Sequence, residues 1–222
     1  MFRHKLSELR SNSFLRSVSV LVSGNVVGQA ILAVALPVAT RLYSPADFAV
    51  LAVFTGVLSI LSVAACLRFE LAIALPERET DALNVLGLAI LIALLFAAVV
   101  AVPAIAVPVQ LAELLNRPDL AVWLWMLSPA LLLAGCHSAL QFWFVRVKSF
   151  RPIAGARIGQ SCAVVGTQIT LGSLGIAPAG LLIGQVFNSG IGCLSLGYRL
   201  IRTQRHQLSS IHWVRMLSLI HI

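Results

Sequence analysis

The chain has 222 residues, of which 59% are hydrophobic and only 11% are charged, and its net charge is +8. A water-soluble domain carries about 25% charged residues, because its surface must face water. The composition therefore excludes a water-soluble enzyme and predicts an integral membrane protein.

Long uncharged intervals predict membrane-spanning helices. A helix needs about 20 residues to cross the hydrocarbon core, and the intervals lack the alternation of apolar and polar residues that a barrel strand requires. The last interval, Ile158 to Tyr198, holds two spans separated by the turn Gly175–Gly180. In chain order the expected spans are 17–40, 46–67, 83–111, 120–145, 158–175 and 179–198. The expected fold is an all-α integral membrane lobe of six transmembrane helices.

Local motifs predict where some helices begin. Ser44 is a capping residue, Pro45 suits the first helical position, and Asp47 places a carboxylate in the first turn. Pro118 opens the fourth span in the same way. Residues 1–16 combine an apolar face with basic positions, which predicts an amphipathic helix at the cytoplasmic interface, although a solvated, frayed terminus explains them equally well.

Basic residues predict the orientation, because Lys and Arg near the ends of spans stay on the cytoplasmic side. Fourteen of the sixteen Lys and Arg fall in four segments that share one side, and Arg41 and Arg117 are the other two. Both termini are therefore expected to be cytoplasmic, with residues 199–216 as a basic linker. Because the charges are divided among short connections, no nucleic-acid partner is expected.

Polar residues inside a span need partners, because lipid offers none. Asn25 and Gln29 share one face of the first helix, and Gly24 and Gly28 form a GxxxG pair on a neighbouring face. Close helix packing explains all four residues. The alternative interpretation places Asn25 and Gln29 on the wall of a hydrated cavity.

Two further spans carry titratable or charged side chains. Arg68 and Glu70 interrupt an apolar stretch at the inner end of the second span, where they are costly unless they pair or face water. Arg68 either snorkels to the headgroups or forms a cationic site for an anionic headgroup. His137 is a possible proton relay, although bonding to a neighbour is the commoner role. Gln141 and Arg146 follow at the cytoplasmic end of the same helix.

Motifs for catalysis or metal binding are not found in the sequence. It contains no GxxxxGK[ST] and no HExxH, and its small acidic cluster at residues 77–81 is typical of a solvated loop. The four cysteines lie inside apolar intervals without a CxxC pair, as packing residues do. We therefore expect no enzymatic activity, no cofactor and no metal site.

Two segments carry a resemblance to a known family. Arg41-Leu-Tyr-Ser-Pro-Ala-Asp-Phe48 and Leu67-Arg-Phe-Glu-Leu-Ala-Ile-Ala-Leu-Pro76 resemble the oligosaccharide flippases, which are Wzx-type polysaccharide biosynthesis proteins of the MOP exporter superfamily. The resemblance implies a bacterial inner-membrane protein with two helical lobes, a cationic central cavity and alternating access. Its implied role is to move an undecaprenyl-pyrophosphate-linked oligosaccharide to the periplasmic leaflet during the biosynthesis of polysaccharide, O-antigen or capsule.

The same resemblance implies a site and partners. It places Arg68 and Glu70 at the cytoplasmic side of the cavity. The full set of candidate substrate-binding residues is Arg68, Glu70, Asn25, Gln29, Arg41, Gln141 and Arg146. The expected partners are the lipid-linked oligosaccharide, membrane lipids, and the polysaccharide polymerase with its chain-length machinery.

The end of the chain departs from the family pattern. Family members have about twice as many spans, so the chain corresponds to an N-terminal lobe, which we do not expect to transport alone. Leu217-Ser-Leu-Ile-His-Ile222 reads like the translated transposon end of a sequencing library. Residues 217–222 are therefore expected to be an adapter artefact, and the biological part of a truncated reading frame is expected to stop near Met216.

Two other functions stay open at this point. A six-span permease subunit of an ABC exporter of polysaccharide or lipid would need a separate ATPase and a docking helix in the fourth connection. A non-transporting membrane scaffold, or an inactive fragment, would tolerate replacement of Arg68 and Glu70.

Overall fold

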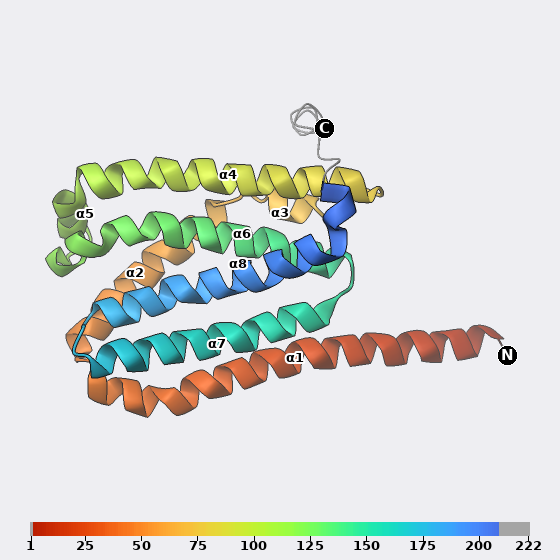
Figure 1. The fold of residues 1–222 in the computed structure, drawn as a ribbon, viewed down its shortest axis with the longest axis horizontal. Helices are drawn as coiled ribbons and strands as arrows, with labels where there is room; N and C mark the ends of the chain where they lie inside the picture. Colours follow the sequence, from red (N-terminus) through yellow and green to blue (C-terminus); the bar gives the residue numbers. More distant parts are fainter. Residues whose placement is uncertain (1, 209–222) are drawn as a thin grey trace.

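The described part of the chain is built from helices (Figure 1). A computed structural model describes the backbone of residues 2–208 and the side chains of residues 18–203. The elements are α1 (Phe2–Leu42), α2 (Pro45–Ala64), α3 (Phe69–Ala72), α4 (Glu79–Ala106), α5 (Pro108–Leu114), the 3-10 helix η1 (Pro118–Met126), α6 (Leu127–Arg146), α7 (Phe150–Ser173) and α8 (Ala179–Leu208). Residues 2–208 contain no strand, so the all-α prediction is confirmed for them.

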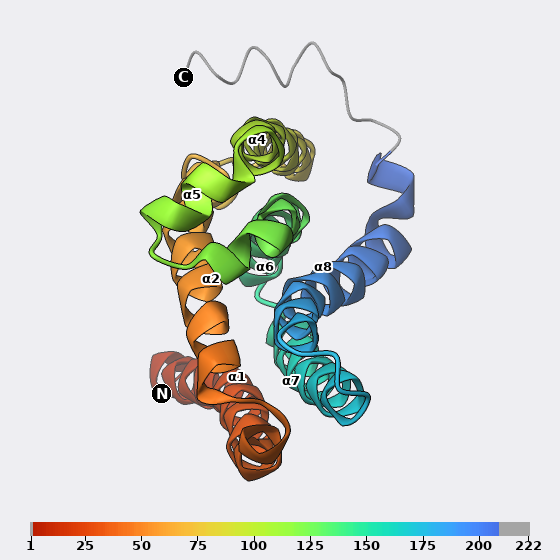
Figure 2. The same ribbon diagram turned by 90° about the vertical axis from the view of Figure 1, so that its left-hand side faces the viewer.

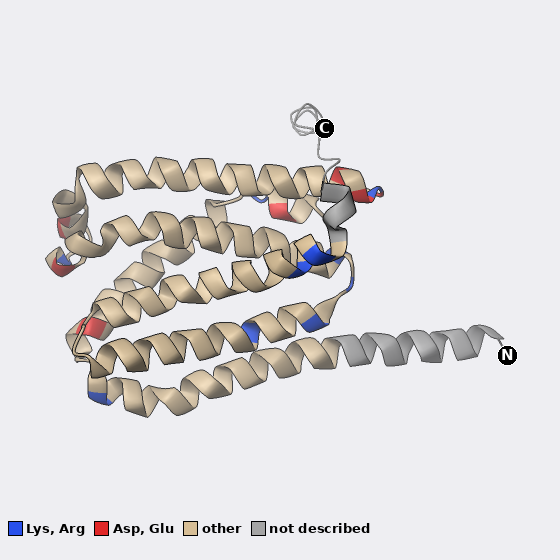
Figure 3. Cartoon of the chain, viewed as in Figure 1, with Lys and Arg blue, Asp and Glu red and all other residues tan. Residues whose placement is uncertain are grey.

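The long helices lie side by side. α7 packs between α1 and α8, and α6 packs between α8 and α4 (Figures 1 and 2). α2 crosses this row, contacting α6 and α8, and runs from the end of α1 toward α4 (Figure 2). α5 and η1 pack together at the end of the bundle where α1 stops. Most charged residues lie near the two ends, and long helical stretches between them carry none (Figure 3).

Within the part of the chain that the structure describes, five helices are long and apolar enough to cross a membrane, which indicates a multi-pass membrane protein. They are Val18–Leu42, Pro45–Ala64, Glu79–Ala106, Pro118–Arg146 and Ala179–Thr203. The expected span 158–175 corresponds to α7, which is long enough but contains Arg151, Arg157 and two glutamines. A sixth crossing by α7, and the cytoplasmic placement of both termini, stay predictions.

The helix starts that the sequence predicts are confirmed. At the start of α2, the Ser44 side chain accepts a hydrogen bond from the backbone N–H of Asp47, and the Asp47 carboxylate accepts one from the Ser44 N–H at 2.8 Å. This reciprocal capping box satisfies two N–H groups that have no partner inside the helix. η1 likewise begins at Pro118.

Other boundaries differ from the prediction. The expected span 83–111 stops at Ala106, because the ring of Pro108 disfavours a helical conformation at Val107, where the backbone has φ −135° and ψ 49°. The fourth span starts as 3-10 helix and becomes α-helical only at Leu127. The second ends at Ala64 rather than at residue 67.

The two ends of the chain also differ in part from the expected segments. α1 is one helix from Phe2 to Leu42, so residues 2–16 continue the first span rather than forming a separate helix. α8 extends to Leu208, so the first part of the expected linker 199–216 is helical. Residues 209–222, and with them the expected artefact 217–222, lie outside the described residues.

Small residues allow α1 to pack closely against α7. A Cβ atom added to Gly24 would lie 2.5 Å from the Cβ of Ala154, and one added to Gly28 would lie 2.8 Å from the Oγ of Ser161. Neither position has room for a larger side chain. The packing interpretation of the GxxxG pair is therefore confirmed.

Tyr43 joins the turn after α1 to the neighbouring helices α7 and α8. Its ring is 4% exposed, and its hydroxyl donates a 2.7 Å hydrogen bond to the backbone oxygen of Gln168. The ring fills space that Gly172 and Gly180 leave, because a Cβ on either glycine would clash with it. Burial, and secondly the nearby Asp47 carboxylate, raise the pKa of the Tyr43 hydroxyl. We call this arrangement the Tyr43 clasp.

Candidate functional site

A small polar cavity lies where α1, α7 and α8 meet, and it reaches the surface at the exposed residues Asn25 and Gln29. Its volume is about 110 Å³. It is lined by Asn25, Gly28, Gln29 and Leu32 of α1, by Arg157, Gln160 and Ser161 of α7, and by Asn188 of α8. Polar side chains from three helices therefore face one space. We call this space the polar cavity.

Arg157 supplies the positive charge of the polar cavity. It lies about 10 Å along α7 from the start of that helix at Phe150, at 1.5 Å per residue. One guanidinium nitrogen donates a 3.2 Å hydrogen bond to the side-chain oxygen of Gln141 on α6. Within the described residues, no carboxylate pairs with Arg157. A guanidinium that is half-buried and lacks a carboxylate is free to bind an anion.

Gln160 fixes the inner wall of the cavity. It is 3% exposed, and its side-chain nitrogen donates a 2.9 Å hydrogen bond to the backbone oxygen of Asn188 and lies 3.3 Å from Nε2 of His137. That ring nitrogen accepts the second amide proton when the neutral imidazole carries its own proton on Nδ1. Gly192 leaves the space that this pair occupies, because a Cβ there would lie 2.6 Å from Nδ1 of His137.

One atom in this wall has an unused hydrogen-bonding capacity. The side-chain oxygen of Gln160 is buried and has no hydrogen-bond partner within the described residues. A buried acceptor without a partner costs free energy. Because surrounding atoms cover this oxygen, it is not offered to a ligand in the polar cavity. The cavity thus presents a cation, Arg157, and the amide side chains of Asn25, Gln29 and Asn188.

Size limits what the polar cavity can hold. Pockets that enclose a drug-sized ligand measure about 300–1,000 Å³, several times the 110 Å³ found here. Liquid water takes about 30 Å³ per molecule, so the cavity holds a few waters or one small anionic group. It cannot enclose an oligosaccharide.

The structure brings together four of the residues expected from the sequence. Asn25 and Gln29 line the polar cavity. Gln141 and His137 lie behind it on α6, where they contact Arg157 and Gln160 respectively. Both interpretations of this part of α1 therefore hold. Asn25 and Gln29 line the cavity, while the two glycines on the adjacent face allow close packing against α7.

The other four expected residues lie elsewhere. Arg41 is exposed at the far end of α1. Arg68 is exposed, and its backbone has a left-handed conformation with φ 63°. Glu70 is only 7% exposed, and one of its carboxylate oxygens has no hydrogen-bond partner within the described residues. Arg146 donates a 2.6 Å hydrogen bond to the backbone oxygen of Pro76. None of the four lines the polar cavity.

Sequence reasoning gave Arg157 no role in a site. It was counted among the basic residues that set the orientation, and Gln160 and Asn188 were not among the candidates. A usable signal was present, since Arg157, Gln160 and Ser161 stand at i, i+3 and i+4 and so share a helix face. The expected span begins at residue 158, which places Arg157 in the connection before it. In the structure Arg157 lies well inside α7.

The family follows from a comparison with known proteins. A family model described as polysaccharide biosynthesis protein matches residues 38–220. The chain belongs to this polysaccharide biosynthesis protein family. Comparison with curated proteins and with solved structures produced no match. The family match includes the Tyr43 clasp and the parts of α6, α7 and α8 around the polar cavity, but it begins after Asn25 and Gln29.

Proposed function

We propose that the chain takes part in moving a lipid-linked oligosaccharide across the bacterial inner membrane for polysaccharide biosynthesis. The observation that carries the proposal is Arg157, a half-buried cation without a carboxylate partner among the described residues, which shares the polar cavity with amide side chains. Membership of a polysaccharide biosynthesis protein family supports the class of substrate.

The chemistry of the polar cavity suits such a substrate. A lipid-linked sugar carries a diphosphate and many hydroxyls, and the hydrocarbon core offers partners for neither. Guanidinium binds phosphate oxygens, and the amides of Asn25 and Gln29 exchange hydrogen bonds with hydroxyls or with water. Because the polar cavity is small, we propose that it forms one hydrated wall of a larger path, on which substrate groups bind in turn.

The proposal includes an arrangement in the membrane. α7 is the sixth crossing, since it lies between two apolar helices that shield its polar face from lipid. Both termini are cytoplasmic, which keeps most Lys and Arg on that side. The role is transport rather than catalysis, and the partners are the lipid-linked oligosaccharide and the polymerase machinery that consumes it.

Replacing Arg157 in the chromosomal gene tests the proposal. The Arg157→Gln variant removes the charge, and we expect polysaccharide export to fall about tenfold or more, because a hydrogen bond to a charged group contributes about 1.5–3 kcal/mol. The lipid-linked repeat unit should accumulate on the cytoplasmic side. Arg157→Lys should retain part of the export. Arg78→Gln, at an exposed position in the connection before α4, is the matched control.

Protein level in the membrane is measured in every strain, so that misfolding is separated from loss of transport. Normal export by Arg157→Gln at normal protein level would refute the proposed role of the polar cavity. An ATPase that co-purifies with the chain, and whose depletion reproduces the defect, would favour the permease alternative instead.

A further inference from the structure

A second and larger space opens at the opposite end of the bundle from α5 and η1. Its volume is about 810 Å³, and residues of α4, α6, α7 and α8, together with the connection before α7, line it. The lining residues that matter here are Glu79, Trp143, Ser149, Tyr198, Arg199 and Arg202. We call this space the basic groove. It shares no lining residue with the polar cavity, and its volume lies within the range of sites that hold a whole small ligand.

The basic groove has an apolar floor and a cationic rim. Trp143 is 1% exposed and Leu200 is 6% exposed, so the floor is formed by well-packed apolar side chains. Arg199 and Arg202 are exposed on the last described turns of α8. Within the described residues, neither guanidinium has a hydrogen bond or an ion pair. The one carboxylate among the lining residues, Glu79, pairs with neither.

The start of α7 adds further attraction for an anion. Ser149 precedes this 24-residue helix and lines the basic groove, and its side chain does not cap the helix. The first turn of α7 contains no acidic residue. The first N–H groups of a helix lack internal partners, and the helix dipole makes this end positive. The groove therefore combines two free guanidinium groups with an uncapped helix N-terminus.

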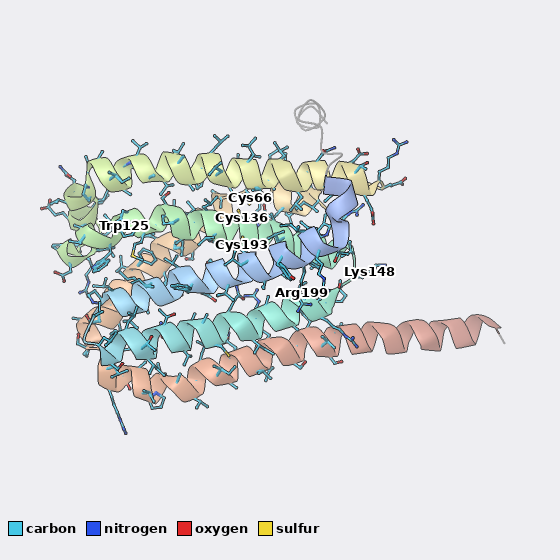
Figure 4. All side chains as sticks on the ribbon, viewed as in Figure 1. Cys66, Trp125, Cys136, Lys148, Cys193 and Arg199 are labelled. Carbon is cyan, nitrogen blue, oxygen red and sulfur yellow. The ribbon has the colours of Figure 1, made fainter. Side chains whose placement is uncertain are left out.

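The surroundings of the basic groove suit a lipid. Lys148, in the connection before α7, and Arg199 of α8 lie at this same end of the bundle (Figure 4), where several basic residues gather (Figure 3). On the outer face of α8, Leu194 is 68% exposed and Ile201 is 55% exposed, as expected of side chains that face acyl chains. A cationic groove thus adjoins an apolar surface, which matches a molecule with an anionic head and apolar tails.

We propose that the basic groove binds the headgroup of an anionic phospholipid from the adjacent leaflet, with its phosphate between Arg199 and Arg202. Basic pockets between membrane helices bind such headgroups, and guanidinium groups match phosphate geometry. The acyl chains then lie along Leu194 and Ile201. This site is independent of the proposed transport, because a structural lipid would stay bound while the polar cavity works.

Native mass spectrometry of the purified full chain tests the proposal with three probes: tetraoleoyl cardiolipin, dioleoyl phosphatidylglycerol and dioleoyl phosphatidylcholine. We expect cardiolipin and phosphatidylglycerol to bind more tightly than phosphatidylcholine. Near a membrane surface, each basic residue strengthens the binding of an anionic lipid about fivefold, so Arg199→Gln with Arg202→Gln should weaken cardiolipin binding about 25-fold. Glu79→Gln should strengthen it, because a repelling charge is removed.

Two controls separate the site from general effects of charge and folding. Arg78→Gln with Arg117→Gln removes the same charge from positions that do not line the groove, and binding should stay unchanged. Arg199→Lys with Arg202→Lys keeps the charge and should retain most of the binding. Helix content and elution volume are compared for all variants.

Two results would overturn the proposal. Equal cardiolipin affinity in the native chain and in the Arg199→Gln, Arg202→Gln variant would show that the groove does not hold the lipid. If undecaprenyl pyrophosphate depends on the two arginines while cardiolipin does not, the groove belongs to the substrate carrier. Neither result depends on the export phenotype of Arg157, so this proposal and the proposed function fail separately.

Discussion

The Tyr43 clasp should contribute measurably to stability, and single substitutions can separate its parts. Tyr43→Phe removes the 2.7 Å hydrogen bond to Gln168 and keeps the ring. We expect a loss of about 1 kcal/mol in the free energy of unfolding, the usual net value of one such bond. Tyr43→Ala also empties the space beside Gly172 and Gly180, and should cost about 3–5 kcal/mol.

The pH dependence provides a sharper test, because burial raises the pKa of Tyr43. Below pH 10 the hydroxyl is protonated in both folded and unfolded chains, so it adds no pH dependence. Above pH 10 the unfolded chain loses the proton first, and stability falls until the pH passes the raised pKa of the folded chain. The stability advantage of the native chain over Tyr43→Phe should therefore shrink at alkaline pH.

Denaturant unfolding of the purified chain in detergent, repeated from pH 8 to pH 11, measures both effects. Tyr198→Phe is the matched control, since Tyr198 is 66% exposed and is the other tyrosine of the chain. The Tyr43→Phe variant and the native chain could instead be equally stable at pH 8 and show the same dependence of stability on pH up to pH 11. That result would show that the Tyr43 hydroxyl does not stabilise the fold.

Two other predictions use the same assay. Gly24→Ala should cost about 1–3 kcal/mol, because the new Cβ meets Ala154 at 2.5 Å. Gly56→Ala, inside α2 and with nothing within 4 Å, should be neutral or stabilise the chain by up to about 1 kcal/mol, because alanine favours a helix over glycine. Equal effects of the two changes would contradict close packing of α1. Arg146→Gln should cost about 1.5 kcal/mol through loss of its bond to the Pro76 carbonyl, and should speed hydrogen exchange in the connection before α4. Unchanged exchange there would show that Arg146 does not hold that connection.

Features that depend on nearby residues could be predicted from the sequence. The start of α2 follows from Ser44 and Asp47, because a capping box forms within one turn. The long apolar helices could be predicted because a span must match the thickness of the hydrocarbon core. The close approach of α1 to α7 could be predicted from the four-residue spacing of Gly24 and Gly28. The shared face of Asn25 and Gln29 was also readable, since the helix period places them together.

Features that depend on contacts between distant residues could not be predicted from the sequence. The hydrogen bond between Arg157 and Gln141 joins two helices across a turn, and no local pattern specifies their register. From the sequence, Arg68 and Glu70 are expected either to pair or to face water, and their separate environments are not predicted. They are two residues apart near a left-handed bend, so one is exposed and the other buried. Arg41 and Arg146 share a charge with Arg157, but their positions at helix ends direct them away from the polar cavity.

The way α1 is held has a mechanical consequence. Within the described residues, this outermost helix packs chiefly against α7, and the Tyr43 clasp fastens its end to α7 and α8 (Figure 1). Any tilt of α1 must therefore be transmitted through α7, the helix on which Arg157 stands. A displacement of the peripheral helix α1 should therefore also shift the half-buried guanidinium of Arg157.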